Sequence, residues 1–89
     1  MENYTELQEI INGLYLSNYE SHDSYQNGYK AAHQFFADNG FDGDVTIDEI
    51  KEIKTFNDAS NTTVTTHIYE CYVDSGSVDY FHFSYETEF

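Results

Sequence analysis

The sequence predicts an α+β fold in which two N-terminal helices pack on a C-terminal three-stranded antiparallel β-sheet. Apolar residues recur at helical spacing within the first 38 residues, whereas β-branched and aromatic runs separated by a turn signal occupy the C-terminal half. A chain of 89 residues has the length of one domain. We therefore expect residues 1–89 to form a single domain with a small core.

The first helix is predicted over residues 5–18. Leu7 and Ile11 begin an apolar stripe with helical spacing, and polar residues occupy the other face. Asn3 and Glu6 have the spacing of a capping box, in which each side chain bonds the free backbone N–H of the other residue. These residues therefore predict where the helix begins.

The second helix is predicted over residues 24–38. Its apolar stripe consists of Tyr25, Tyr29, Ala32 and Phe36. Gly28 is unfavourable inside a helix by about 1 kcal/mol relative to alanine, which indicates close packing, and we expect the partner to be the first helix. Gly40 followed by Phe41 predicts a C-terminal stop, in which glycine adopts the left-handed conformation and the next residue folds back.

Two strands are predicted over residues 62–73 and 78–85, where β-branched and aromatic residues dominate. A two-residue loop at Ser75-Gly76 would place Ile68 opposite Phe83. One face of this hairpin would then hold Val64, Ile68, Phe81, Phe83 and Tyr85, and the other His67, Tyr69, Cys71, Tyr80 and His82. Because both faces are aromatic, this pattern leaves open which one meets the helices.

The segment from Val45 to Phe56 fits two structures. Thr46 and Glu49 have capping-box spacing, and isoleucines at every third position favour a short helix. The β-favouring residues around Ile53, followed by a polar turn, favour a strand instead. We predict a strand over residues 50–56, which completes the three-stranded sheet.

Residues 38–49 resemble the calcium-binding loop of the EF-hand. Asp38, Asp42, Gly43 and Glu49 match its first, fifth, sixth and twelfth positions, but Gly40 stands where the third position needs an oxygen ligand. An EF-hand also needs a helix after Glu49. We therefore expect no calcium binding tighter than about 1 mM, the weak end of the range for such loops.

Other site chemistry is sparse. His67 and His82 would lie near each other and near Cys71 across the hairpin, but exposed histidines on a sheet are commoner than a metal site. The sequence has no phosphate loop, dinucleotide motif or nucleophile elbow. We expect no enzyme activity, no cofactor and no bound metal.

The charge is the most informative feature for function. The chain carries 17 Asp and Glu against 3 Lys and no Arg, for a formal net charge of −14. Such a domain repels nucleic acid and anionic membranes and attracts basic surfaces over distance. Carboxylates along helices and strands can imitate a row of phosphates, and aromatic side chains among them can serve as binding anchors.

In size, acidity, tyrosine content and lack of catalytic motifs, the chain resembles the small phage-encoded inhibitors, which include anti-CRISPR proteins and other DNA mimics. The resemblance implies a non-enzymatic inhibitor that blocks the nucleic-acid site of a basic protein, such as a CRISPR effector or nuclease, in the bacterial cytoplasm. Alternatives are an immunity-type inhibitor of a basic nuclease toxin and a single-loop calcium-binding module. The candidate partner-binding residues are Glu20, Asp23, Glu70, Asp74, Asp79, Tyr80, Glu86 and Glu88.

Overall fold

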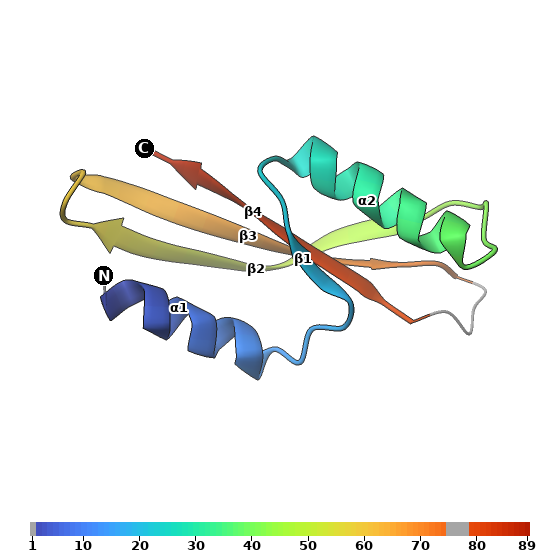
Figure 1. Ribbon diagram of the computed structural model, residues 1–89, viewed down its shortest axis with the longest axis horizontal. Helices are drawn as coiled ribbons and strands as arrows, with labels where there is room; N and C mark the ends of the chain where they lie inside the picture. Colours follow the sequence, from blue (N-terminus) through green and yellow to red (C-terminus); the bar gives the residue numbers. More distant parts are fainter. Residues whose placement is uncertain (1, 75–78) are drawn as a thin grey trace.

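The computed structural model describes residues 2–74 and 79–89 and shows an α+β fold with a four-stranded mixed sheet (Figure 1). Its elements are α1 (Glu2–Gly13), β1 (Tyr19–Ser21), α2 (Tyr25–Asp38), β2 (Thr46–Asn57), β3 (Thr62–Tyr72) and β4 (Phe81–Glu88). The strands lie in the order β1-β4-β3-β2, and β1 runs parallel to β4 while the other pairs are antiparallel. The α+β class is confirmed, but the predicted three-stranded antiparallel sheet is wrong.

The additional strand, β1, also separates the two helices, so they do not form the predicted N-terminal pair. It has only three residues and no strand pattern of its own. It exists because it pairs with the distant β4, and the Tyr19 hydroxyl hydrogen-bonds the Ser84 hydroxyl at 2.6 Å. A strand that depends on a partner more than 60 residues away leaves little signal in its local sequence.

Helix α2 has the predicted limits because both ends carry their own stop signals. Ser24 is extended and caps the helix by accepting a hydrogen bond from the Asn27 N–H at 3.2 Å. At the other end Gly40 is left-handed with φ of 86°, and the Phe41 N–H donates to the Phe36 carbonyl at 2.9 Å. This arrangement is a Schellman motif, as the sequence predicts.

Helix α1 ends at Gly13, five residues before its predicted end. Tyr15 and Asn18 have φ of 53° and 44°, and two left-handed residues so close together cannot continue a helix. The Asn18 side chain instead donates to the Tyr80 carbonyl at 2.7 Å, which ties this segment to the start of β4. Asn3 lies inside the helix, so the predicted capping box is wrong.

Strand β2 confirms the predicted strand and extends it to both sides. The alternative helix starting at Thr46 is therefore wrong. The EF-hand resemblance fails at the same place, because Glu49 lies within the strand and no helix follows it. The pairing of β2 with β3 shifts between Glu49 and Lys51, which marks a β-bulge at Ile50.

The β3–β4 hairpin is confirmed, but its predicted register is wrong by one residue. Ile68 pairs with Ser84, and Phe83 pairs with Tyr69. Because side chains alternate between faces, a slip of one residue moves every side chain of one strand to the other face. Phe83 therefore shares a face with Tyr69, not with Ile68. The predicted Ser75-Gly76 turn lies outside the described residues.

The two helices cover opposite faces of the sheet and bury separate cores (Figure 1). On the α2 face the fully buried residues are Ala32, Phe36, Cys71 and Phe83, with Phe81 nearly so. On the α1 face Leu7 and Ile11 pack with Ile53 and Ile68.

The molecule is elongated, with extents of 45 × 24 × 17 Å. Among the described residues, no helix has the length and apolar character needed to cross a membrane.

Gly28 packs against β4 rather than against the first helix. A Cβ atom built at Gly28 would lie 2.1 Å from the Phe83 ring, so glycine alone lets α2 approach the sheet this closely. The buried line of α2 accordingly consists of Gly28, Ala32 and Phe36. Tyr25 and Tyr29, which the sequence assigns to the apolar stripe, are 37% and 44% exposed.

Candidate protein-binding surface

One acidic surface lies at the turn end of the β3–β4 hairpin, beyond α1 (Figure 1). Its strand-borne and stacked side chains, Asp48, Glu70, Tyr72 and Tyr80, lie on the sheet face to which α1 packs, whereas Asp74 and Asp79 stand just beyond the strand ends. We call it the hairpin-end surface and define it by Asp48, Glu70, Tyr72, Asp74, Asp79 and Tyr80. Asp48, Asp74 and Asp79 are exposed, and Tyr80 is 47% exposed. The surface therefore combines accessible carboxylates with accessible aromatic rings.

Two carboxylates of this surface stand directly opposite each other. Asp48 on β2 pairs with Glu70 on β3, and Glu70 pairs on its other side with His82 on β4. Like charges in opposed positions on a sheet destabilise it. Two neighbours offset the cost, because the Tyr72 hydroxyl donates to Asp48 at 3.1 Å and the His82 Nε2 lies 3.5 Å from the Glu70 carboxylate.

The aromatic rings of the surface are ordered by stacking. Tyr72 and Tyr80 stack with ring centroids 5.6 Å apart, and Tyr80 also stacks with His82 at 6.4 Å. The hydrogen bond to Asp48 raises the pKa of Tyr72, and the charges of Asp48, Asp74 and Glu70 add to the effect. Tyr72 therefore stays neutral and remains a hydrogen-bond donor.

The buried thiol of Cys71 lies beneath this surface, and the same carboxylates affect its pKa. Cys71 lies on the opposite face of β3 and has no exposed surface. Burial, followed by the negative charges of Glu70 and Asp48, raises the pKa of Cys71 to about 12. The thiol is thus protonated at neutral pH and unsuited to act as a nucleophile or a metal ligand.

The structure brings together only half of the residues predicted to bind a partner. Glu70, Asp74, Asp79 and Tyr80 all belong to the hairpin-end surface. The predicted register would have separated Glu70 from Tyr80, because it places Glu70 on the face of Ile68 and Tyr80 on the other face, whereas the observed register brings both to one face. The contact between Asp48 and Tyr72 depends on the register of β2 against β3, which the sequence does not specify.

The other predicted residues lie elsewhere. Glu86 and Glu88 are exposed at the far end of β4, about 20 and 26 Å along the strand from Tyr80 at 3.3 Å per residue. Glu20 lies on β1, where its carboxylate is 3.0 Å from the His22 Nε2. Asp23 accepts a hydrogen bond from the Asn27 side chain beside the start of α2. These four carboxylates therefore cannot act with the hairpin-end surface as one compact patch.

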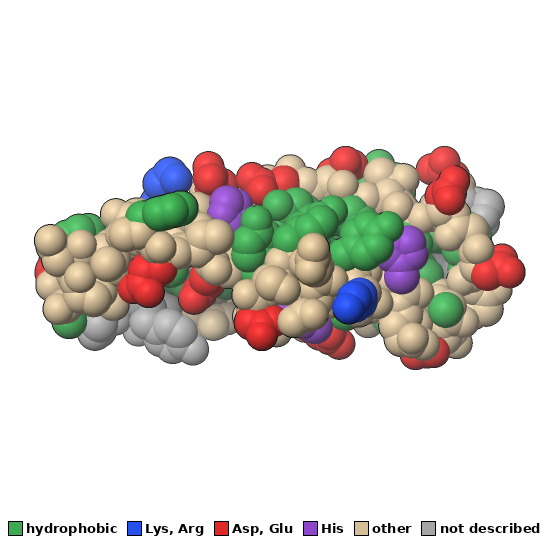
Figure 2. All heavy atoms as spheres, turned by 90° about the horizontal axis from the view of Figure 1, so that it is seen from above, with side chains coloured by type: hydrophobic (Ala, Val, Ile, Leu, Met, Phe, Trp, Pro, Cys, Tyr) green, Lys and Arg blue, Asp and Glu red, His purple; other side chains and the backbone are tan. Residues whose placement is uncertain are grey.

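A second surface lies on the α2 side, where Figure 2 shows a patch of hydrophobic side chains with carboxylates and histidines around it. Tyr25 connects its members: its ring lies 6.1 Å from Tyr29, 5.2 Å from Tyr69 and 6.3 Å from Tyr85. The sequence predicts Tyr25 and Tyr29 in the apolar stripe of the second helix, so its pattern gives no sign of this tyrosine patch.

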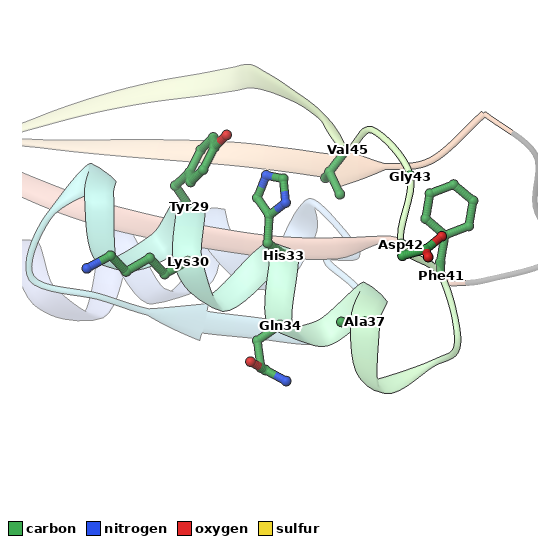
Figure 3. Close-up of a pocket in the computed structure, with 9 residues that line it drawn as sticks. All are labelled: Tyr29, Lys30, His33, Gln34, Ala37, Phe41, Asp42, Gly43 and Val45. Carbon is green, nitrogen blue, oxygen red and sulfur yellow. The ribbon is translucent and has the colours of Figure 1, made fainter.

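A groove of about 550 Å³ lies between α2 and the segment that leads into β2 (Figure 3). Tyr29, His33, Phe41 and Val45 supply much of its lining, and Lys30 and Asp42 stand at its sides. The buried Nε2 atom of His33 has no hydrogen-bond partner among the described residues. Within the lining the rings of Tyr29 and His33 contact each other, with centroids 4.4 Å apart.

The predicted grouping of His67, His82 and Cys71 does not form. His67 pairs with Tyr85 and His82 with Glu70, which places the two histidines on opposite faces of the hairpin.

A comparison of the chain with protein-family models, with curated proteins and with solved structures finds no match. The case for a function therefore depends on the charge, shape and surfaces described above.

Proposed function

We propose that this protein is a non-enzymatic inhibitor that binds a basic, nucleic-acid-handling protein and blocks its nucleic-acid site. The observation that carries the proposal is the distribution of charge over length. A net charge of −14 along a body 45 Å long amounts to one negative charge per about 3.2 Å. One strand of DNA carries one charge per about 3.4 Å, so a channel that accepts nucleic acid meets a comparable line charge here.

The width of the body supports the same proposal. Its smaller extents are 24 and 17 Å. These widths are comparable with the thickness of a nucleic-acid duplex, so we expect a channel that accepts a duplex to accept this body. The chain contains no arginine, so no guanidinium group of its own can pair with its carboxylates in place of the partner's basic residues.

The hairpin-end surface is the proposed contact. Asp48 and Glu70 face each other at a cost to the sheet, and a basic partner would relieve that repulsion. Tyr80, which is 47% exposed and stacked on Tyr72, is placed to act as an aromatic anchor. Carboxylates would steer the encounter and the tyrosines would supply most of the affinity.

The test begins with a pull-down from bacterial lysate followed by mass spectrometry, and continues with the captured partner and its own DNA or RNA. We expect competition between the protein and the nucleic acid, with association slowing as salt rises past about 0.15 M, where the screening length is about 8 Å. Tyr80→Ala should weaken binding by about 2 kcal/mol or more if this ring is an anchor. Binding alongside intact nucleic acid, with no salt dependence, would refute the proposal.

Two triple variants locate the contact. The first reverses charge at Asp48, Asp74 and Asp79, and the second makes the same change in charge at Asp58, Glu86 and Glu88, which are exposed at the other end of the hairpin. A single exposed ion pair is worth about 0–1 kcal/mol, so only a combined reversal at the contact should have a large effect. We expect the first variant to lose competition and the second to retain it. The reverse result would move the contact to the far end.

A further inference from the structure

The β-bulge in β2 places two carboxylates on the same side of the sheet. Glu49 lies opposite Tyr69, and Glu52 lies opposite His67, although Glu49 and Glu52 are three residues apart. In a regular strand, residues three apart point to opposite faces. The extra residue, Ile50, shifts the alternation of side chains by one, so Glu49 and Glu52 point to the same face. Both glutamates therefore lie with His67 on the α2 side of the sheet.

These three side chains converge on one point. The His67 Nδ1 is 3.3 Å from the Glu49 Oε1 and 3.9 Å from the Glu52 Oε2. One donor atom from each residue lies within 4.8 Å of the other two. Ligand atoms around a tetrahedral zinc ion, at about 2.0–2.2 Å from the metal, are separated by about 3.4 Å. The observed spacing thus needs only small side-chain movements to match.

His67 is held in the orientation that a ligand needs. Its side chain is only 16% exposed, and its ring stacks on Tyr85 with centroids 4.8 Å apart and an interplanar angle of 17°. Its other ring nitrogen, Nε2, lies 3.4 Å from the Thr87 hydroxyl. In the absence of metal Nδ1 hydrogen-bonds the Glu49 carboxylate, so an incoming ion must replace the Nδ1 proton. Nε2–H can then donate to the Thr87 hydroxyl, the second-nitrogen bond that metal-binding histidines characteristically make.

We propose that Glu49, Glu52 and His67 form a binding site for a divalent transition-metal ion, with zinc as the preferred ion. The set of one imidazole and two carboxylates suits zinc better than calcium, because calcium takes oxygen ligands almost exclusively. Three protein ligands leave at least one position for water. The strong negative charge of the chain raises the local concentration of cations and favours occupancy.

The site has a built-in competitor. The Lys54 Nζ lies 3.7 Å from the Glu52 Oε2, so an incoming ion must displace this ammonium group. Substitution of Lys54 by glutamine should therefore strengthen metal binding. An increase in affinity on Lys54→Gln is informative because a variant that merely unfolds cannot produce it.

The test is calorimetric titration of the whole protein with zinc chloride, together with thermal unfolding with and without the metal. We expect saturable binding of one ion, weakened at least about tenfold by Glu52→Gln or His67→Gln. Zinc should raise the unfolding temperature of the wild type but not of these variants. A parallel titration with calcium chloride should give much weaker binding.

A matched control comes from the pair formed by His22 and Glu20, which has a similar contact of 3.0 Å but a single carboxylate. Glu20→Gln should leave zinc binding unchanged. The proposal is overturned if zinc shows no saturable binding below about 1 mM, the weak end for protein metal sites. It is equally overturned if His67→Gln binds as well as the wild type.

Discussion

Replacement of Gly28 by alanine tests how closely α2 approaches the sheet. A Cβ at this position would lie 2.1 Å from one carbon of the Phe83 ring and 2.3 Å from a second, whereas ordinary contact begins at 3.4 Å. The ring would have to retreat by about 1.3 Å, the difference between 3.4 and 2.1 Å. Phe83 has no exposed surface and stacks on Tyr69 at 5.0 Å, so no free space lies behind it.

Two opposing terms decide the outcome. Alanine is favoured over glycine inside a helix by about 1 kcal/mol. Overpacking of a filled core costs about 1–3 kcal/mol, and a rigid ring held by stacked neighbours places this site at the upper end. We therefore expect Gly28→Ala to lower the free energy of unfolding by about 2 kcal/mol. For a domain of this size that corresponds to a fall of about 8–16 °C in Tm.

The assay is thermal and urea unfolding of Gly28→Ala beside two further variants. Gly13→Ala is the matched control, because Gly13 also lies in a helix but has nothing within 4 Å of the added Cβ. It should retain or slightly increase stability. In a Phe83→Leu background, Gly28→Ala should cost much less, since the ring it would meet is gone. If Gly28→Ala is as stable as the wild type, the close approach of α2 to β4 is wrong.

Two more predictions concern pH and salt. Because the pKa of Cys71 rises from 9.0 to about 12 on folding, the contribution of this thiol to stability should be constant below pH 9 and fall between pH 9 and 12, by up to about 1.4 kcal/mol per pH unit. The raised pKa of Tyr25, Tyr69 and Tyr72 adds a fall of the same sign above about pH 10, which remains in Cys71→Ala. Urea unfolding at pH 8 and about pH 10 measures this, and a fall of the same size in Cys71→Ala would contradict it. Raising salt from about 0.02 M to about 0.5 M should raise the urea midpoint, since it screens repulsion within a chain of charge −14. An unchanged or lower midpoint would show that this repulsion does not limit stability.

The parts of the fold that the sequence predicts are those with local causes. Helix α2 has its cap at Ser24 and its stop at Gly40 within a few residues of its ends, so both limits could be predicted. Strands β3 and β4 could be predicted from their content of β-branched and aromatic residues. The remaining features depend on distant partners: β1 forms only against β4, and the early end of α1 coincides with the contact between Asn18 and the start of β4.

The candidate sites follow the same division. Glu70 and Tyr80 share one face only in the observed register, because the predicted register, which differs by one residue, places them on opposite faces. The grouping of Glu49 and Glu52 with His67 could not be predicted, because it depends on the bulge at Ile50, and a strand of regular period would separate the two glutamates. The predicted register of the β3–β4 hairpin was wrong because both of its faces are aromatic, so the pattern of side chains does not favour one register over the other.

The hairpin-end surface, which we propose as the contact, is held in place by the side chains behind it. The His82 Nδ1 lies 3.0 Å from the Ser17 N–H and its Nε2 faces Glu70, so a buried side chain links the segment after α1 to an exposed carboxylate. The Tyr80 carbonyl accepts from Asn18, and the Tyr80 ring is stacked on a second tyrosine. Side chains held in this way lose little conformational entropy when a partner binds, and ordering costs about 0.5–1.5 kcal/mol for each side chain that is free. The same number of carboxylates on mobile loops would provide equal steering but weaker affinity, which is why we place the contact on this surface rather than among the isolated charges elsewhere.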